Sequence, residues 1–139
     1  MTATEETSSS PNGRRTTTAV HSRDAAGWAQ VCRLDQLVPG RGAAAKVDGR
    51  QVALIRWYDD DVVYAIDNRD PFSGAHVMSR GIVGDKAGIP KVASPIFKQS
   101  FDLGTGQCLD DDRVTLTTFP VRVTDEGWVE IEVEVEASK

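Results

Sequence analysis

The sequence has few of the side chains from which metal sites are usually built. Its 139 residues include two cysteines and two histidines, and neither cysteine lies within a few residues of the other or of a histidine. The closely spaced ligand pairs of zinc and iron–sulfur sites are therefore missing. In a cytosolic chain we expect Cys32 and Cys108 to be buried thiols rather than a disulfide.

Long apolar runs and clusters of basic residues are also missing. No apolar stretch approaches the ~20 residues of a bilayer span, and residues 1–10 have neither a basic start nor an apolar segment. The sequence therefore predicts a cytoplasmic protein with no membrane partner. Sixteen Lys and Arg against 21 Asp and Glu give a net charge of −5. An acidic chain of this kind is a poor candidate for binding nucleic acid.

No familiar catalytic or nucleotide-binding motif is complete. Gly104-Thr-Gly106 lacks the third glycine of a dinucleotide fingerprint, and no phosphate loop or Gly-x-Ser-x-Gly elbow occurs. His76 is the one candidate general base in the expected folded part, and the sequence reveals no group that would orient it. The acidic run 110–112 offers oxygen ligands without EF-hand spacing, which is more typical of an exposed turn. We therefore expect no catalytic residue in this chain, which favours a subunit over an independent enzyme.

The remaining pattern predicts one all-β domain after an N-terminal tail. Residues 1–26 have one large aliphatic side chain, Val20, so we expect a disordered tail and a folded domain at 27–139. Alternating segments separated by turns such as Asp48-Gly49 predict an antiparallel β-sandwich or barrel. The expected strands are 28–33, 43–47, 51–57, 62–66, 99–103, 107–109, 114–119, 121–124 and 128–135, with a helical turn at 34–37.

The last expected strand alternates strictly between aliphatic residues and glutamates. The aliphatic side chains should face the core while Glu130, Glu132, Glu134 and Glu136 face outwards. Such an outer face is either a solvated surface that discourages edge-to-edge aggregation or an acidic docking surface for a basic partner.

Residues 67–98 interrupt the β pattern. Glycines and prolines recur there without a period of 2 or 3.6 residues, and such excursions inside a β domain are usually functional or disordered. The segment also contains buried-looking apolar residues, so we expect an ordered but irregular lobe. These residues are Phe72, Val77, Met78, Ile82, Val83, Ile96 and Phe97.

Three motifs follow one another in and after this lobe. They are Asp70-Pro-Phe72, Ser94-Pro-Ile-Phe97 and Phe101-Asp-Leu-Gly-Thr-Gly106. In this order they resemble the cluster-binding half of a Rieske [2Fe–2S] domain, where a C-x-H loop and a C-x-x-H loop precede Phe-Asp-Leu-x-Thr-Gly. The resemblance implies a Rieske-like antiparallel β-sandwich or barrel with an inserted lobe.

All four cluster-ligand positions of the Rieske pattern are changed. Asp70 and Phe72 replace the first Cys and His, and Ser94 and Phe97 replace the second pair. Cluster iron is held by thiolate sulfur and imidazole nitrogen, whereas a phenyl ring has no lone pair and Asp or Ser offers a hard oxygen. We therefore expect a lobe without iron, in which the two phenylalanines fill the space of the cluster.

Further motifs make residues 27–136 similar to the small subunit of the NAD(P)H-dependent assimilatory nitrite reductase. In this family the large subunit carries FAD, sirohaem and a [4Fe–4S] cluster, and reduces nitrite to ammonium with six electrons from NAD(P)H. The resemblance implies that this chain binds the large subunit, holds no cofactor and contributes docking, stability or gating. The motifs are Trp28-x-x-Val-Cys-x-Leu-x-x-Leu37, Asn68-Arg-Asp-Pro-Phe72, Ser79-Arg-Gly-Ile82, Val92-Ala-Ser-Pro95, Lys98-Gln99 and Gly106-Gln-Cys-Leu109.

By analogy with the tip of Rieske proteins, the lobe is the expected contact face with the large subunit. An alternative for its charges is an ordinary solvated surface. Two other functions also stay open: a stand-alone binding or regulatory module, and a Rieske ferredoxin that carries electrons, against which the missing ligands argue. The expected contact residues are Arg69, Pro71, Arg80, Lys91, Pro95 and Lys98.

Overall fold

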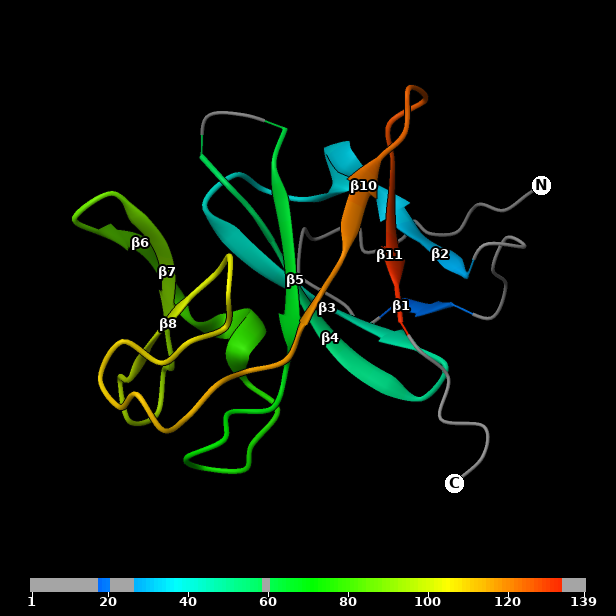
Figure 1. Cartoon of the computed structure of the whole chain (residues 1–139). Helices are drawn as coiled ribbons and strands as arrows, with labels where there is room; N and C mark the ends of the chain where they lie inside the picture. Colours follow the sequence, from blue (N-terminus) through cyan, green and yellow to red (C-terminus); the bar gives the residue numbers. More distant parts are fainter. Residues whose placement is uncertain (1–17, 21–26, 59–60, 134–139) are drawn as a thin grey trace.

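The structure, a computed structural model that describes residues 18–20, 27–58 and 61–133, is built around three β-sheets (Figure 1). The first sheet has the order β1 (Thr18–Val20), β3 (Arg41–Val47), β4 (Arg50–Arg56), β5 (Val63–Asp67) and β9 (Thr118–Phe119). The second has the order β10 (Val121–Val123), β11 (Trp128–Glu132) and β2 (Trp28–Arg33). The third has the order β6 (Ile82–Lys86), β7 (Ile89–Ala93) and β8 (Ser100–Asp102). The predicted antiparallel β class is confirmed, with one parallel pair between β1 and β3.

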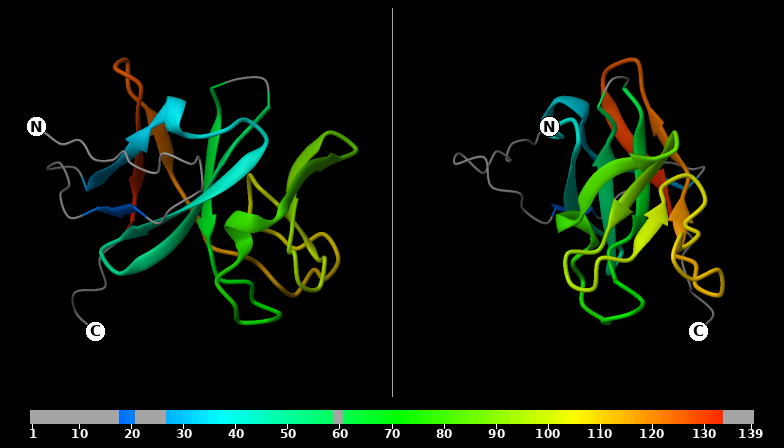
Figure 2. Two further views of the ribbon diagram at one scale, coloured as in Figure 1. Left: turned by 180° about the vertical axis from the view of Figure 1, so that it is seen from behind. Right: turned by 90° about the vertical axis from the view of Figure 1, so that its left-hand side faces the viewer.

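The first sheet is the middle layer, and β4 is buried on both of its faces. Val52 and Leu54 belong to a core shared with the second sheet, while Ala53 and Ile55 belong to a second core shared with the third sheet. The continuous apolar run in β4 follows from this position, because a strand covered on both sides has no solvated face. The views from front and back show β6, β7 and β8 on the side of β4 and β5 that lies away from β2 (Figures 1 and 2).

The lobe is more regular than the sequence predicts. Residues 82–93 form the β6–β7 hairpin, whose pairing runs from Ile82–Ala93 to Lys86–Ile89. At its turn, Ala87 and Gly88 have φ angles of 51° and 87°, which suit a type I′ hairpin. The expectation of an irregular segment was wrong here because Gly84 and Pro90 hide the alternation that marks a strand.

Several predicted boundaries shift in the structure. Thr18–Val20, inside the predicted tail, pair with residues 45–47 of β3, while the rest of the tail lies outside the described residues. Strand β11 ends at Glu132 rather than continuing to 135, and residues 134–136 lie outside the described part of the chain. In the predicted strands 107–109 and 114–119, Gln107, Cys108 and Thr115 make isolated bridges, and Thr118–Phe119 form the strand β9. The turn at Asp48-Gly49 is confirmed, with both φ angles positive.

The expectation that Glu130 faces solvent was wrong. Val129 and Ile131 are fully buried as expected, but Glu130 is buried too. Its carboxylate accepts a hydrogen bond of 2.6 Å from Arg122 Nε, and the Arg122 guanidinium stacks 4.4 Å from the centre of the Trp28 ring. The outer face of the second sheet is therefore covered by its own long side chains.

Regular helix is limited to two 3₁₀ turns in the described residues. The turn η2 (Leu34–Gln36) confirms the predicted helical turn, and η3 (Met78–Arg80) carries the buried Met78 into the second core. Neither is long or apolar enough to be a membrane span.

Candidate functional site

Two loops of the lobe meet at a buried carboxylate. Residues 68–76 follow β5 and residues 94–99 connect β7 with β8. Asp70 from the first loop and Ser94 from the second are both completely buried. The Ser94 hydroxyl donates a hydrogen bond of 2.6 Å to Asp70 Oδ2, and the Ser73 hydroxyl donates one of 2.9 Å to the same oxygen. Two of the four positions where a Rieske domain has ligands thus form a direct hydrogen-bonded junction.

The same two residues also organise their own loops. The Phe72 N–H donates to Asp70 Oδ1 over 2.9 Å, and the Gly74 N–H donates to the Asp70 carbonyl over 2.7 Å. In the second loop the Ile96 N–H donates to the Ser94 hydroxyl oxygen, and the Lys98 N–H donates to the Ser94 carbonyl. Asp70 and Ser94 therefore each begin a turn that is closed by backbone hydrogen bonds, and their side chains also bind each other between the loops.

The hydrogen bonds keep the Asp70 carboxyl charged. Burial acts to raise its pKa, but hydrogen bonds from Ser94, Phe72 and Ser73 favour the ionised form, and the net effect lowers the pKa of Asp70 below its usual value. A charged carboxylate is a stronger acceptor than a neutral one, so the ionised state strengthens the junction.

Asn68 anchors the base of the first loop. Its side-chain oxygen accepts a hydrogen bond of 2.8 Å from the Ser79 N–H, and its amide nitrogen donates to the His76 carbonyl and to Gln51. Sequence reasoning quoted Asn68 as part of a motif and assigned it no role. A buried amide with all of these partners ties the loop to both η3 and β4.

Phe72 and Phe97, at the other two ligand positions, differ in burial. Phe72 packs against the second core, with its ring centre 6.2 Å from that of Phe101, as expected. Phe97 is 57% exposed, so the expectation that it fills the cluster space was wrong. The Asp70–Ser94 junction brings the loops into direct contact, and the turn at 94–98 points the Phe97 side chain outwards.

The residues at the junction do not fit a [2Fe–2S] cluster. The four positions offer a carboxylate, a hydroxyl and two phenyl rings, where a cluster takes thiolate and imidazole. Neither cysteine belongs to the two loops: Cys108 lies in the second core, and Cys32 lies in β2. Burial, with a smaller effect of the Asp35 charge, raises the pKa of Cys32 to about 12, which disfavours a thiolate. The described residues contain no cluster of three or more acidic, cysteine or histidine side chains that could hold a metal.

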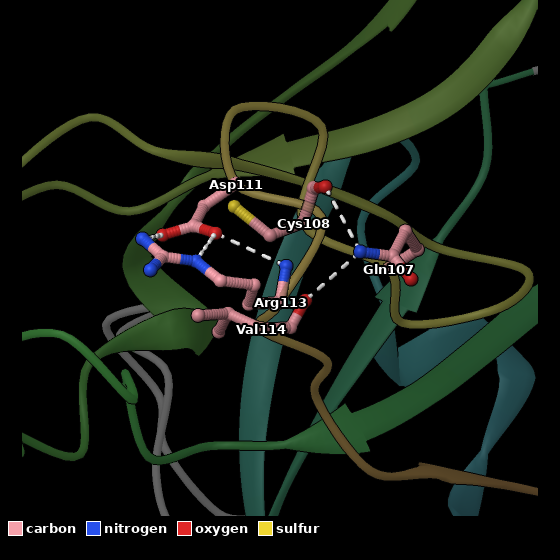
Figure 3. A network of polar contacts seen from close by, with 5 residues as sticks. All are labelled: Gln107, Cys108, Asp111, Arg113 and Val114. Carbon is pink, nitrogen blue, oxygen red and sulfur yellow. Dashed lines mark hydrogen bonds and ion pairs between the residues drawn. The ribbon is translucent and has the colours of Figure 1, made fainter.

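Two carboxylates of the acidic run 110–112 are hydrogen-bonded within the protein, and Figure 3 shows the contacts of Asp111. Asp111 binds the Arg113 guanidinium over 3.0 and 3.1 Å. Asp110, which the figure does not draw, accepts a hydrogen bond of 2.8 Å from the Ser100 N–H. The neighbouring Gln107 donates to the carbonyls of Cys108 and Val114. These contacts make residues 107–114 a structured turn, in line with the structural alternative that the sequence left open.

The structure brings four of the six expected contact residues to the junction. Arg69 and Pro71 flank Asp70, and Pro95 and Lys98 belong to the turn that begins at Ser94. Both charged residues are exposed, and Lys98 Nζ lies 3.1 Å from the Pro95 carbonyl. The remaining two lie outside both loops: Arg80 ends η3, and Lys91 in β7 donates to the Ser100 hydroxyl.

The three-layer β fold and its two joined loops define a Rieske-like domain, and the model of the Rieske-like [2Fe-2S] domain matches residues 27–132. The nitrite reductase (NADH) small subunit of Salmonella typhimurium is 42% identical over 98 residues, which are 70% of this chain and 91% of that protein. A Mycobacterium tuberculosis protein described as an NADH-dependent nitrite reductase small subunit has a crystal structure that superposes with a TM-score of 0.74 and 54% identity, covering 78% of this chain and 96% of that one. The chain therefore belongs to the Rieske-like family of nitrite reductase small subunits.

A third relative is a much longer polypeptide. The nitrite reductase [NAD(P)H] large subunit of Klebsiella oxytoca is 40% identical over 103 residues, which are 73% of this chain and 11% of that protein. A domain of this family is thus part of a large-subunit polypeptide in that organism.

Proposed function

We propose that this chain is the accessory small subunit of a cytoplasmic NAD(P)H-dependent nitrite reductase. In this proposal the large subunit carries FAD, sirohaem and a [4Fe–4S] cluster and reduces nitrite to ammonium. The small subunit binds it and contributes docking, stability or gating, without a catalytic residue of its own. In this proposal the working unit is the domain at 27–139, and residues 1–26 precede it and contribute the short strand β1 to its first sheet.

The observation that carries this proposal is the Klebsiella polypeptide, in which a related domain is covalently joined to a large subunit. Covalent joining raises the effective concentration of two modules to the millimolar range. A separate small subunit must instead bind the large subunit through a non-covalent interface. The 42% identity to a small subunit supports the same role in two chains.

The donor set at the junction supports a subunit without a [2Fe–2S] cluster. The side-chain oxygens of Asp70 and Ser94 form hydrogen bonds with each other and with backbone N–H groups of the loops. In this proposal the lobe therefore recognises a partner and does not transfer electrons. Iron and acid-labile sulfide analysis of the purified chain tests this point. We expect substoichiometric amounts of both and no Rieske-type absorption. One cluster per chain would contradict it and favour the electron-carrier function.

Reconstitution tests the proposed function itself. The full chain is mixed with the nitrite reductase large subunit of the same organism, and co-elution in gel filtration is measured together with NAD(P)H-dependent nitrite reduction. We expect one complex and a higher or restored activity. If the chain neither co-elutes nor changes the rate, the stand-alone binding or regulatory module becomes the better interpretation.

We also propose that the lobe supplies the interface, through Arg69, Pro71, Arg80, Lys91, Pro95 and Lys98. Arg69 and Lys98 carry the clearest support because both are exposed beside the junction. The double variant Arg69→Glu, Lys98→Glu is expected to weaken the complex at least about tenfold without lowering the melting temperature. The matched control reverses Lys46, an exposed lysine on β3. Equal affinities of both variants would remove the lobe charges from the interface.

A further inference from the structure

The turn at 94–98 exposes two neighbouring apolar side chains. Ile96 is 43% exposed and Phe97 is 57% exposed. Elsewhere in the lobe, Phe72 and Met78 pack into the second core, whereas Ile82 and Ile89 of the β6–β7 hairpin are also exposed, one on each strand. Exposed aromatic and aliphatic side chains that stand together mark interaction sites more often than isolated ones do.

The turn that presents them is held rigidly. The Ser94 N–H donates to the Gln99 carbonyl over 2.9 Å, and the Lys98 N–H closes the turn on the Ser94 carbonyl over 3.1 Å. The buried Ser94–Asp70 hydrogen bond then fixes the turn to the first loop. Because the backbone is already ordered, binding through this turn loses little conformational entropy.

The charge around the turn differs from that of the rest of the chain. Residues 67–98 contain five basic and three acidic residues, whereas the remainder contains 11 basic and 18 acidic residues. One of the three acidic residues, Asp70, is buried at the junction. The apolar pair thus lies beside Lys98 in a net basic segment of an otherwise acidic protein, and a complementary surface has the opposite charge.

We propose that Ile96 and Phe97 are the apolar anchor of the small subunit, and that they insert into an apolar pocket with an acidic rim on the nitrite reductase large subunit. This inference rests on the proposed function, and it names the side chains and the partner chemistry of that interface. Phe97 is the central contact, because an aromatic ring buries a large area at little cost in side-chain entropy. Basic side chains such as Lys98 then meet the rim.

The test compares the affinity of the full chain and of four variants for the large subunit holoenzyme by titration calorimetry; the variants are Phe97→Ser, Phe97→Leu, Ile96→Ser and Val38→Ser. Phe97→Ser is expected to weaken binding at least about tenfold. Val38→Ser is the matched control, because Val38 is 56% exposed and lies before β3, outside the lobe; it should change the affinity by less than about twofold. Melting temperatures of the variants are measured alongside, and Phe97→Leu should recover part of the affinity.

The outcomes separate this inference from the proposed function. If the unmodified chain does not bind the large subunit, the proposed function fails. If it binds but Phe97→Ser and Ile96→Ser both bind as tightly as Val38→Ser, the anchor is overturned while the proposed function stands. The acidic rim is tested by repeating the titration of the unmodified chain from about 50 to 300 mM salt, over which charge attraction is progressively screened. An affinity that does not fall would overturn the acidic rim.

Discussion

The Asp70 carboxylate accepts three hydrogen bonds, two within its own loop and one from Ser94 of the other loop, and its charge makes this junction sensitive to pH. The folded-state pKa of Asp70 is lowered. A group whose pKa is lower in the folded than in the unfolded chain stabilises the fold above its unfolded pKa of about 4, and this contribution is lost as pH falls through the folded pKa. We therefore expect the free energy of unfolding to fall below about pH 4, and to fall less steeply in Asp70→Asn.

Urea unfolding at pH 6, 4 and 3 measures this difference. The control is Asp111→Asn, since the pKa of Asp111 is also lowered by its hydrogen bonds with Arg113, but on the protein surface. Exposed ion pairs contribute little to stability, so the control should keep the acid dependence of the unmodified chain. A steep acid loss that persists in Asp70→Asn would assign the effect to other carboxylates.

Gly106 lies where both the backbone angle and the space exclude a side chain. Its φ is +82°, and a Cβ there would lie 2.0 Å from the Leu116 carbonyl oxygen. The Leu116 N–H also donates to the Gly106 carbonyl over 2.7 Å, so a shift of either residue would break this bridge. Gly106→Ala is expected to lower the free energy of unfolding by about 3 kcal/mol or more.

Gly49 is the matched control for this substitution. Its φ is +84°, but a Cβ there meets nothing within 4 Å, so Gly49→Ala measures the backbone angle alone, at about 1 kcal/mol. Chemical denaturation of both variants gives the comparison. Equal losses would mean that the loop at Leu116 moves aside without cost.

In strand β11 the sequence pattern predicted the residues that face the core but not the burial of Glu130 on the opposite face. Strict alternation placed Val129 and Ile131 in the core correctly, but it could not reveal that Arg122 and Gln30 reach over Glu130 from the neighbouring strands. The sequence pattern did not predict the β6–β7 hairpin for a related reason. Glycine and proline within a short strand remove the periodic signal, while cross-strand pairing still forms the ladder.

The pairing of Glu130 with Arg122 leads to a prediction about this sheet. Glu130→Ala leaves the Arg122 guanidinium without its 2.6 Å contact, and it should lower the free energy of unfolding by about 1 kcal/mol. Glu132→Ala, two residues along the same strand and half-buried, should stay within about 0.5 kcal/mol of the unmodified chain. Thermal unfolding by circular dichroism compares them. The reverse order would mean that Glu130 is buried without contributing to stability.

Across the whole molecule, the two cores predict how far the chain can be shortened. Among the residues whose burial is described, the members of both cores lie within 29–133, and β1 adds three residue pairs along the edge of β3. A chain that begins at Gly27 should therefore fold cooperatively, with a melting temperature lower by about 2–6 °C because the β3 edge loses these pairs. Differential scanning calorimetry checks this. Loss of a cooperative transition would show that the N-terminal residues belong to the folded unit.

Composition and strand alternation alone were enough for the β class and most strands of the first two sheets, while the Rieske-like layout of the two loops was implied by the resemblance of the motif order to a known family. These properties depend on local periodicity and on residues close together in the chain. Packing in three dimensions decided the rest. The Asp70–Ser94 junction joins residues 24 positions apart, and beside it two similar side chains lie differently: Phe72 is partly buried against the second core, whereas Phe97 is exposed. A change of residue type predicts which ligand is lost, but only the geometry of the loops determines where each replacement side chain points.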